Sequence, residues 1–168
     1  MQAINILSRI LKILTITSFS ALVLVVIIQI TGRYTPFSFV WTEELSRFLF
    51  IFSIAFAAPI AMEQREYVRV DLFVDFLPKK VRKYVEALIY LILGLFSAYL
   101  VSFAYEFSLI GQNQSSATLS IEMFYIHLSM VILFVFLALY SFFNIYAVLK
   151  LDQHKELDQQ EEKEGVNL

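Results

Sequence analysis

Four stretches of this chain contain no aspartate, glutamate, lysine or arginine, and their lengths restrict what the chain can form. They comprise residues 13–32, 48–62, 87–105 and 123–149. A helix needs about 20 mainly apolar residues to cross the roughly 30 Å hydrocarbon core of a bilayer. The first, third and fourth stretches reach that length directly, and the second reaches it by extending back to Trp41 or forward to Arg65. The sequence therefore predicts an all-α membrane protein with four transmembrane helices.

The overall composition agrees with a membrane protein. Of the 168 residues, 59% are hydrophobic and 17% are charged, and a soluble domain of this size could not bury so much apolar surface. No linker or second domain is apparent, so we expect a single four-helix domain over residues 1–151. Residues 152–168 form a charged, apolar-poor tail that we expect to be disordered. Cysteine is absent from the sequence, which excludes disulfides and thiolate metal sites.

Lysine and arginine are distributed unequally between the two sides of the predicted helices. Two precede the first helix, six lie in the loop after the second helix and three lie in the tail, which makes eleven on one side. Arg33 and Arg47 alone lie on the other side. The positive-inside rule therefore predicts that both termini are cytoplasmic. Residues 68–84 are too charged to span, and we expect a short apolar turn there, capped by Asp71 and ending at Leu77, to lie in the cytoplasmic interface.

The outer end of the second helix carries charges close to its apolar part. Only 15 residues separate Arg47 from Glu63, which is about 22 Å of helix. Glu43, Glu44 and Arg47 should therefore lie at or just below the membrane surface, where charges need a protein partner or a wet interface. Thr42 is expected to cap this helix, and Glu43 and Arg47 to pair at i,i+4 spacing. We predict a docking site here, although one of the two glutamates could equally be a surface charge among the headgroups.

Small residues at i,i+4 spacing predict close helix packing on two helices. On the second helix these are Ser53, Ala57 and Ala61, and on the third helix Gly94, Ala98 and Ser102. For the second helix, chance placement in an alanine-rich segment explains the pattern about equally well. The third-helix pattern is the more informative, because the chain has only four glycines.

The sequence contains no recognisable catalytic or metal-binding pattern. His127 lies near the outer end of the last helix and His154 lies in the cytoplasmic tail, near the opposite face of the membrane, so we expect no shared haem or metal site. We expect His127 to be an interfacial or interhelical hydrogen-bonding residue. Tyr140 and Asn144 are one turn apart and are expected to form hydrogen bonds between helices. Central charges and broken helices, which secondary transporters use to hold solute and ions, are missing from the apolar stretches. We therefore predict no enzyme activity, no cofactor and no solute pathway within this chain alone.

The segment WTEELSRFLFIFSIAFAAPIAMEQREYVRVDLFVDFLP, residues 41–78, resembles the signature of the small membrane subunit of tripartite ATP-independent periplasmic (TRAP) transporters, the DctQ-like family. The acidic helix start, the small residues of the second helix and the pair Val70 and Asp71 carry the resemblance. The specific residues fall within about 33–78, whereas the rest of the chain matches in helix number and orientation. Tyr67 departs from the pattern, because many relatives have histidine there.

This resemblance implies a non-catalytic subunit of a sodium-driven transporter in the bacterial inner membrane, surrounded by phospholipids and without a nucleic-acid partner. A periplasmic (DctP-like) binding protein would capture a carboxylate solute, and a large (DctM-like) subunit would move it by an elevator motion. The small subunit would widen the static scaffold and help to dock the binding protein. Likeness to the sialic-acid branch implies sialic acid as the solute.

This expected function, together with the predicted topology, gives two sets of site residues. The expected contacts with the large subunit are Trp41, Glu43, Glu44, Arg47, Arg69 and Asp71, and the expected receptor-docking residues are Tyr34, Gln112 and Gln114. Two other classes of function stay open. A small membrane-embedded redox or enzyme subunit would reveal itself by a bound chromophore, and an autonomous four-helix exporter by transport with this chain alone.

Overall fold

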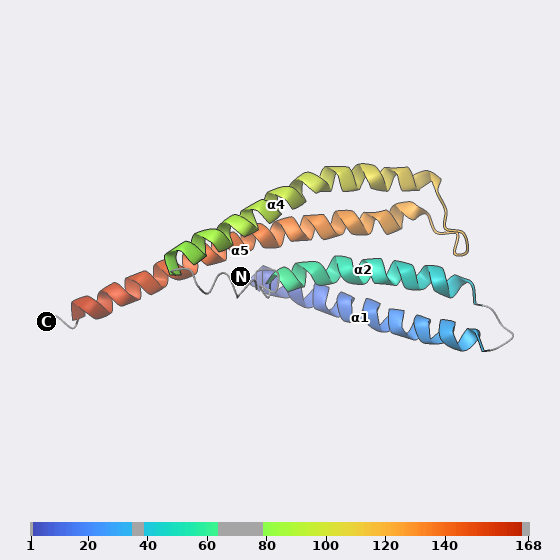
Figure 1. The fold of residues 1–168 in the computed structure, drawn as a ribbon, viewed down its shortest axis with the longest axis horizontal. Coiled ribbons are helices and arrows are strands. Elements are labelled where there is room, and N and C mark those ends of the chain that lie inside the picture. The colour runs from blue at the N-terminus through green and yellow to red at the C-terminus, as the bar shows by residue number, and fades with distance from the viewer. Residues whose placement is uncertain (1, 35–38, 64–78, 166–168) are drawn as a thin grey trace.

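The structure is a computed structural model that describes residues 2–34, 39–63 and 79–165 (Figure 1). Its helices are α1 (Gln2–Gly32), α2 (Trp41–Glu63), α4 (Lys79–Ile110) and α5 (Met123–Gly165), with a 3-10 turn η2 (Gly111–Asn113) after α4. Each of these four long helices contains a segment long and apolar enough to cross a membrane, and these segments are Ile6–Gly32, Trp41–Glu63, Tyr84–Asn113 and Met123–Val148. They confirm the predicted four-helix membrane fold. The expected interfacial segment lies outside the described residues.

Helix α2 reaches spanning length by extending back to Trp41, one of the two extensions expected from the sequence. The prediction that Thr42 caps this helix is wrong, because the helix has already begun at Trp41. The Thr42 hydroxyl instead donates a hydrogen bond to the Phe39 carbonyl, at 2.6 Å. Pro59 lies inside α2, and the helix continues beyond it to Glu63.

Helices α4 and α5 are both longer than their charge-free stretches. Helix α4 continues past Tyr105 to Ile110, so Glu106, which follows the charge-free stretch, is a helical residue. Helix α5 continues to Gly165, although we expected disorder from residue 152 onwards. Lysine, glutamate, glutamine and leucine are all good helix formers, so the charge of this segment limits burial without preventing a helix.

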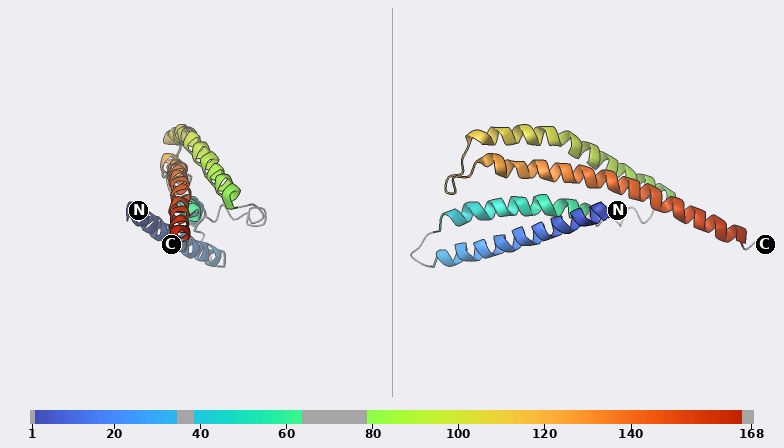
Figure 2. Two further views of the ribbon diagram at one scale, coloured as in Figure 1. Left: turned by 90° about the vertical axis from the view of Figure 1, so that its left-hand side faces the viewer. Right: turned by 180° about the vertical axis from the view of Figure 1, so that it is seen from behind.

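The four helices form a layer that is one helix deep over much of its length. Helix α1 packs against α2, α2 against α5, and α5 against α4, which leaves α1 and α4 at the two edges (Figures 1 and 2). Such a layer buries few side chains. In its most apolar window, α1 has 6% of its residues buried, and none of the four spans exceeds 28%. Broad apolar faces are therefore left for lipid or for other membrane helices.

The two hairpins, α1–α2 and α4–α5, are joined at the end where the N-terminus lies. A buried cluster there comprises Leu11, Ile60, Met62, Tyr90, Tyr140 and Val148. Two hydrogen bonds between the described parts of the hairpins accompany it. The Tyr140 and Ser8 hydroxyl oxygens are 2.7 Å apart, and Asn144 Nδ2 donates to the Met62 carbonyl at 3.1 Å. These bonds confirm the prediction that Tyr140 and Asn144 connect helices.

The contact between α4 and α5 uses small residues, as predicted for Gly94. A Cβ atom at Gly94 would lie 3.1 Å from Ser141 Cβ, so glycine allows the two helices to approach. The buried small residues on this face of α4 are Gly94, Ser97, Ala104 and Ser108. Ala98 and Ser102 lie outside the contact and are exposed. Successive steps of four residues advance about 40° beyond a full turn, so the stripe that begins at Gly94 turns away from α5.

Candidate docking site at the outer ends of the helices

The start of α2 presents an ion pair at the surface of the chain, and we call this end of the helices the outer end after the orientation that the sequence predicts. Arg47 Nη2 and Glu43 Oε1 are 2.9 Å apart, and both side chains are 67% exposed. The pairing is the i,i+4 pair that the sequence predicts. Beside it, the exposed ring of Trp41 contacts Phe39 edge-on, with a centroid distance of 6.5 Å. Trp41, Glu43 and Arg47 are therefore accessible to a partner, as a docking surface requires.

Glu44, the neighbouring glutamate, is bound within the chain. Its carboxylate accepts hydrogen bonds from the backbone amides of Ala117, Thr118 and Leu119, at 2.9, 3.0 and 3.0 Å. The Thr118 hydroxyl also donates to it. Three consecutive amides around one carboxylate fasten the loop between η2 and α5 to the start of α2. We call this set of contacts the outer clasp. The two glutamates thus differ in structure, with Glu43 exposed beside Arg47 and Glu44 engaged by the loop.

The loop held by the outer clasp is closed by its own hydrogen bonds. The Ser116 amide donates to the Ile121 carbonyl at 2.9 Å, and the Met123 amide donates to the Gln114 carbonyl at 2.9 Å. In Figure 1 the loop extends from the α4–α5 hairpin towards the start of α2. The two hairpins are therefore tied at both ends, by the outer clasp at one end and by the bonds of Tyr140 and Asn144 at the other.

The residues expected to meet a periplasmic receptor all lie at this outer end. Tyr34, just after α1, is 87% exposed, and Gln112 and Gln114 are exposed on η2 and immediately after it. The loop that carries Gln114 is the one that the outer clasp holds. Arg69 and Asp71, which were expected to contact a large subunit, lie outside the described residues.

The three small residues that were predicted to pack on α2 are buried or half-buried. Ser53 is buried and donates to the Leu49 carbonyl of its own helix at 2.7 Å, whereas Ala57 and Ala61 are half-buried.

His127 was expected to form a hydrogen bond. It instead packs its ring against Phe107, with a centroid distance of 4.3 Å, and its Nδ1 is buried without a hydrogen-bond partner in the described structure.

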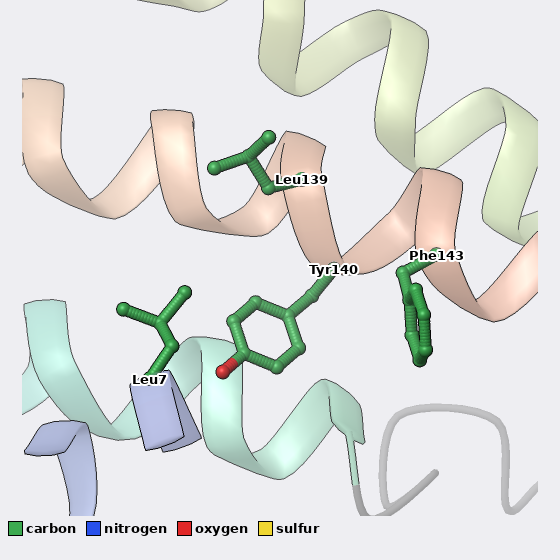
Figure 3. Close-up of a pocket in the computed structure, with 4 residues that line it drawn as sticks. All are labelled: Leu7, Leu139, Tyr140 and Phe143. Carbon is green, nitrogen blue, oxygen red and sulfur yellow. The ribbon is translucent and has the colours of Figure 1, made fainter. Parts of the chain in front are cut away.

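The described residues enclose an apolar cavity and form no cluster suited to a metal ion. None of them form a group of three or more histidine, aspartate or glutamate side chains that could hold a metal ion. A cavity of about 350 Å³ lies between α1 and α5, lined by Leu7, Leu139, Tyr140 and Phe143 (Figure 3). Its lining is almost entirely apolar, and the Tyr140 hydroxyl is already bonded to Ser8. The chain is a multi-pass membrane protein whose described polar side chains mainly bond to their own helix, connect neighbouring helices or lie exposed at its outer end.

Comparison with known proteins identifies the family. The model of the family described as "Tripartite ATP-independent periplasmic transporters, DctQ component" matches residues 22–151, which is most of the chain. The chain belongs to this family. It is therefore a small subunit component of a TRAP transporter and a multi-pass protein of the inner membrane, which confirms the resemblance seen in residues 41–78.

Two curated relatives match shorter segments. The chain is 49% identical over 39 residues to the isethionate TRAP transporter permease protein DctMQ of Oleidesulfovibrio alaskensis, which covers 23% of this chain and 6% of that protein. It is 30% identical over 77 residues to the sialic acid TRAP transporter permease protein SiaT of Haemophilus influenzae, which covers 45% of this chain and 12% of that protein. The match thus spans no more than about an eighth of the length of either relative.

Proposed function

We propose that this chain is the non-catalytic small subunit of a sodium-driven, binding-protein-dependent transporter for an organic anion. It associates with a large DctM-like membrane subunit and a periplasmic DctP-like solute receptor. It lies in the inner membrane among phospholipids, with both termini in the cytoplasm. The family match carries this proposal, because the DctQ component is by its description one part of a tripartite system.

Sialic acid is the specific solute that we propose. The name of one relative specifies sialic acid and that of the other specifies isethionate. Both are organic acids that are anionic at neutral pH, and the likeness of the chain to the sialic-acid branch, whose relative matches the longer segment of 77 residues, favours the first. Solute and sodium ions would bind to the large subunit, since the described interior of this chain has an apolar cavity and no cluster of carboxylates.

The small subunit acts in this proposal as an extension of the static scaffold. Support comes from the two ties between its hairpins, the outer clasp at one end and the Ser8–Tyr140 and Asn144–Met62 hydrogen bonds at the other. A part that braces a moving subunit has to resist separation of its own helices. The single-layer arrangement also offers a wide surface for lateral contact.

We assign the contacts with both partners to the outer ends of the helices. Trp41, Glu43 and Arg47 contact the large subunit, and Arg69 and Asp71 remain part of that proposal from the sequence. Glu44 contributes by holding the loop rather than by touching the partner. The exposed residues Tyr34, Gln112 and Gln114 meet the receptor.

Purification and reconstitution test this function. A tagged chain purified in mild detergent should retain the large subunit, and liposomes with both subunits should take up sialic acid when receptor and a sodium gradient are supplied. Liposomes with this chain alone should not transport. Transport by the chain alone would favour an autonomous exporter, and a visible chromophore in the purified chain would favour a redox subunit.

A further inference from the structure

Helix α4 carries a regular stripe of residues that face away from the rest of the chain. Successive residues of the stripe are four and three positions apart in turn. Helices that pack along their length in coiled coils use the same spacing. The stripe comprises Leu88, Ile92, Leu95, Tyr99, Ser102 and Glu106, and every one of these side chains is exposed. We call it the outer α4 seam.

The outer α4 seam lies opposite the face that contacts α5. Tyr99 is five positions after Gly94 and five before Ala104, both of which are buried against α5. At about 100° per residue, it is turned by roughly 140° from each of them, in opposite directions. Tyr99 therefore points directly away from α5, at the free edge of the helix layer.

Tyr99 places a hydroxyl where lipid cannot satisfy it. It is in the middle of the 30-residue segment Tyr84–Asn113, so it lies near the bilayer midplane, about 15 Å from the headgroups. Its side chain is 63% exposed and its ring contacts Phe103 at a centroid distance of 4.9 Å, but its hydroxyl makes no hydrogen bond to the described residues. An unpaired hydroxyl in hydrocarbon is unfavourable, so an acceptor from another protein is expected.

Glu106 adds a charge to the same stripe. It is two turns outward from Tyr99, about 10 Å along the helix, which leaves it near the outer boundary of the hydrocarbon core. Its side chain is exposed and makes no ion pair or hydrogen bond with the part of the chain that the structure describes. A carboxylate at that depth is rare and expensive unless a partner supplies a cation or hydrogen-bond donors.

We propose that the outer α4 seam is the surface on which a helix of the large membrane subunit docks, with a hydrogen-bond acceptor facing Tyr99 and an arginine or lysine facing Glu106. This inference rests on the function proposed above. The partner helix runs along α4 in the membrane. Ser102 allows close approach, since its side chain is small and its hydroxyl already donates to the Tyr99 carbonyl at 2.9 Å.

The charge of the seam argues against two other occupants. A second copy of this chain would have the same orientation in the membrane, so a symmetric contact would bring two Glu106 carboxylates together at the same depth. Lipid tails offer neither an acceptor for Tyr99 nor a cation for Glu106. Helix α1 contrasts with α4 in this respect. The exposed polar residues in the middle of α1 are Thr17 and Ser20, whose types can bond to carbonyls of their own helix.

Photocrosslinking in the assembled complex tests which helix face the partner covers. A benzophenone amino acid is placed in the outer α4 seam at Leu95, and at two matched exposed positions of α1, Phe19 and Leu24. Irradiation of membranes that contain the whole transporter should give an adduct with the large subunit from Leu95 and none from α1. Adducts with the large subunit from α1 alone would overturn the proposal, as would a Leu95 adduct with a second copy of this chain.

Two substitutions test the chemistry of the contact. Tyr99→Phe removes only the hydroxyl and Glu106→Gln only the charge, and Glu122→Gln is the matched control at an exposed outer position away from the seam. Each seam variant should lower the retained large subunit about tenfold relative to wild type, and the control should not. Thermal unfolding of each purified subunit checks that the fold is intact.

The outcomes separate this inference from the proposed function. Normal retention of the large subunit by both seam variants would overturn the seam contact and leave the transporter assignment intact. Failure of the wild-type chain to retain any large subunit would overturn both.

Discussion

Asn144 allows a quantitative test of the link between the two hairpins. Its side chain is 6% exposed, and its Nδ2 donates to the carbonyl of Met62, which lies in the last turn of α2. The final carbonyls of a helix have no amide partner further along it, so a donor from another helix can take that role. Asn144 of α5 thus supplies the donor that the end of α2 lacks.

Replacing Asn144 by leucine removes the donor and leaves the Met62 carbonyl in an apolar environment. The bond is lost and the buried carbonyl is left without a donor, so the free energy of unfolding should fall by about 1–2 kcal/mol. This is towards the upper end of the values measured for interhelical hydrogen bonds within membranes. The matched control is Asn113→Leu, since Asn113 is exposed at the outer end of η2, and its change should stay within about 0.5 kcal/mol.

Reversible unfolding in mixed micelles of mild detergent and dodecyl sulfate measures both changes. Far-UV circular dichroism reports the helices, and Trp41, the single tryptophan, reports the outer start of α2 by fluorescence. The reasoning is refuted if Asn144→Leu and Asn113→Leu shift the free energy of unfolding equally, or if Asn144→Leu is as stable as wild type.

Three further predictions concern other parts of the chain. Cysteines introduced at Ser115 and at Gln160 should be labelled by an impermeant reagent from opposite sides of the membrane, and labelling of both from the periplasm would overturn the proposed orientation. Glu44→Gln should speed amide hydrogen exchange in residues 117–119, because a neutral amide is a weaker acceptor for those three donors, whereas Glu43→Gln should leave exchange there unchanged. Tyr140→Phe should lower the free energy of unfolding by about 1 kcal/mol through loss of its bond to Ser8, and an unchanged value would show that this bond does not hold the hairpins together.

The features that the sequence predicted well are those with few physical alternatives. Charge-free stretches of spanning length are expected to cross the membrane, and large polar side chains within them need partners, which neighbouring helices can supply. Tyr140 and Asn144 were recognised for that reason, and both bond to another helix. Gly94 was recognised because a glycine among large residues marks a close approach, and it faces Ser141.

The features that were missed depend on contacts between distant residues or on the exact turn of a helix. Nothing local distinguishes Glu44 from Glu43, because the partner loop of Glu44 lies more than 70 residues away. The charge-free stretch that marks the third helix ends at Tyr105, but a charged residue does not end a helix, and α4 includes Glu106. The alternating four-and-three spacing from Leu88 to Glu106 was the sequence signal that would have placed it on the exposed face of α4.

The positions of the bonds that connect the two hairpins also impose an order on the synthesis and membrane insertion of this protein. The outer clasp uses the backbone of residues 117–119, and the inner bonds use Tyr140 and Asn144, whereas their partners all lie before residue 64. During synthesis the α1–α2 hairpin is therefore complete well before any residue that fastens it has left the ribosome. It has to enter the membrane as an independent pair of helices and remain there without its partner until the second hairpin is inserted. Mutations that weaken α1–α2 contacts should consequently be exposed to quality-control proteases during that interval, even when the finished subunit would be stable.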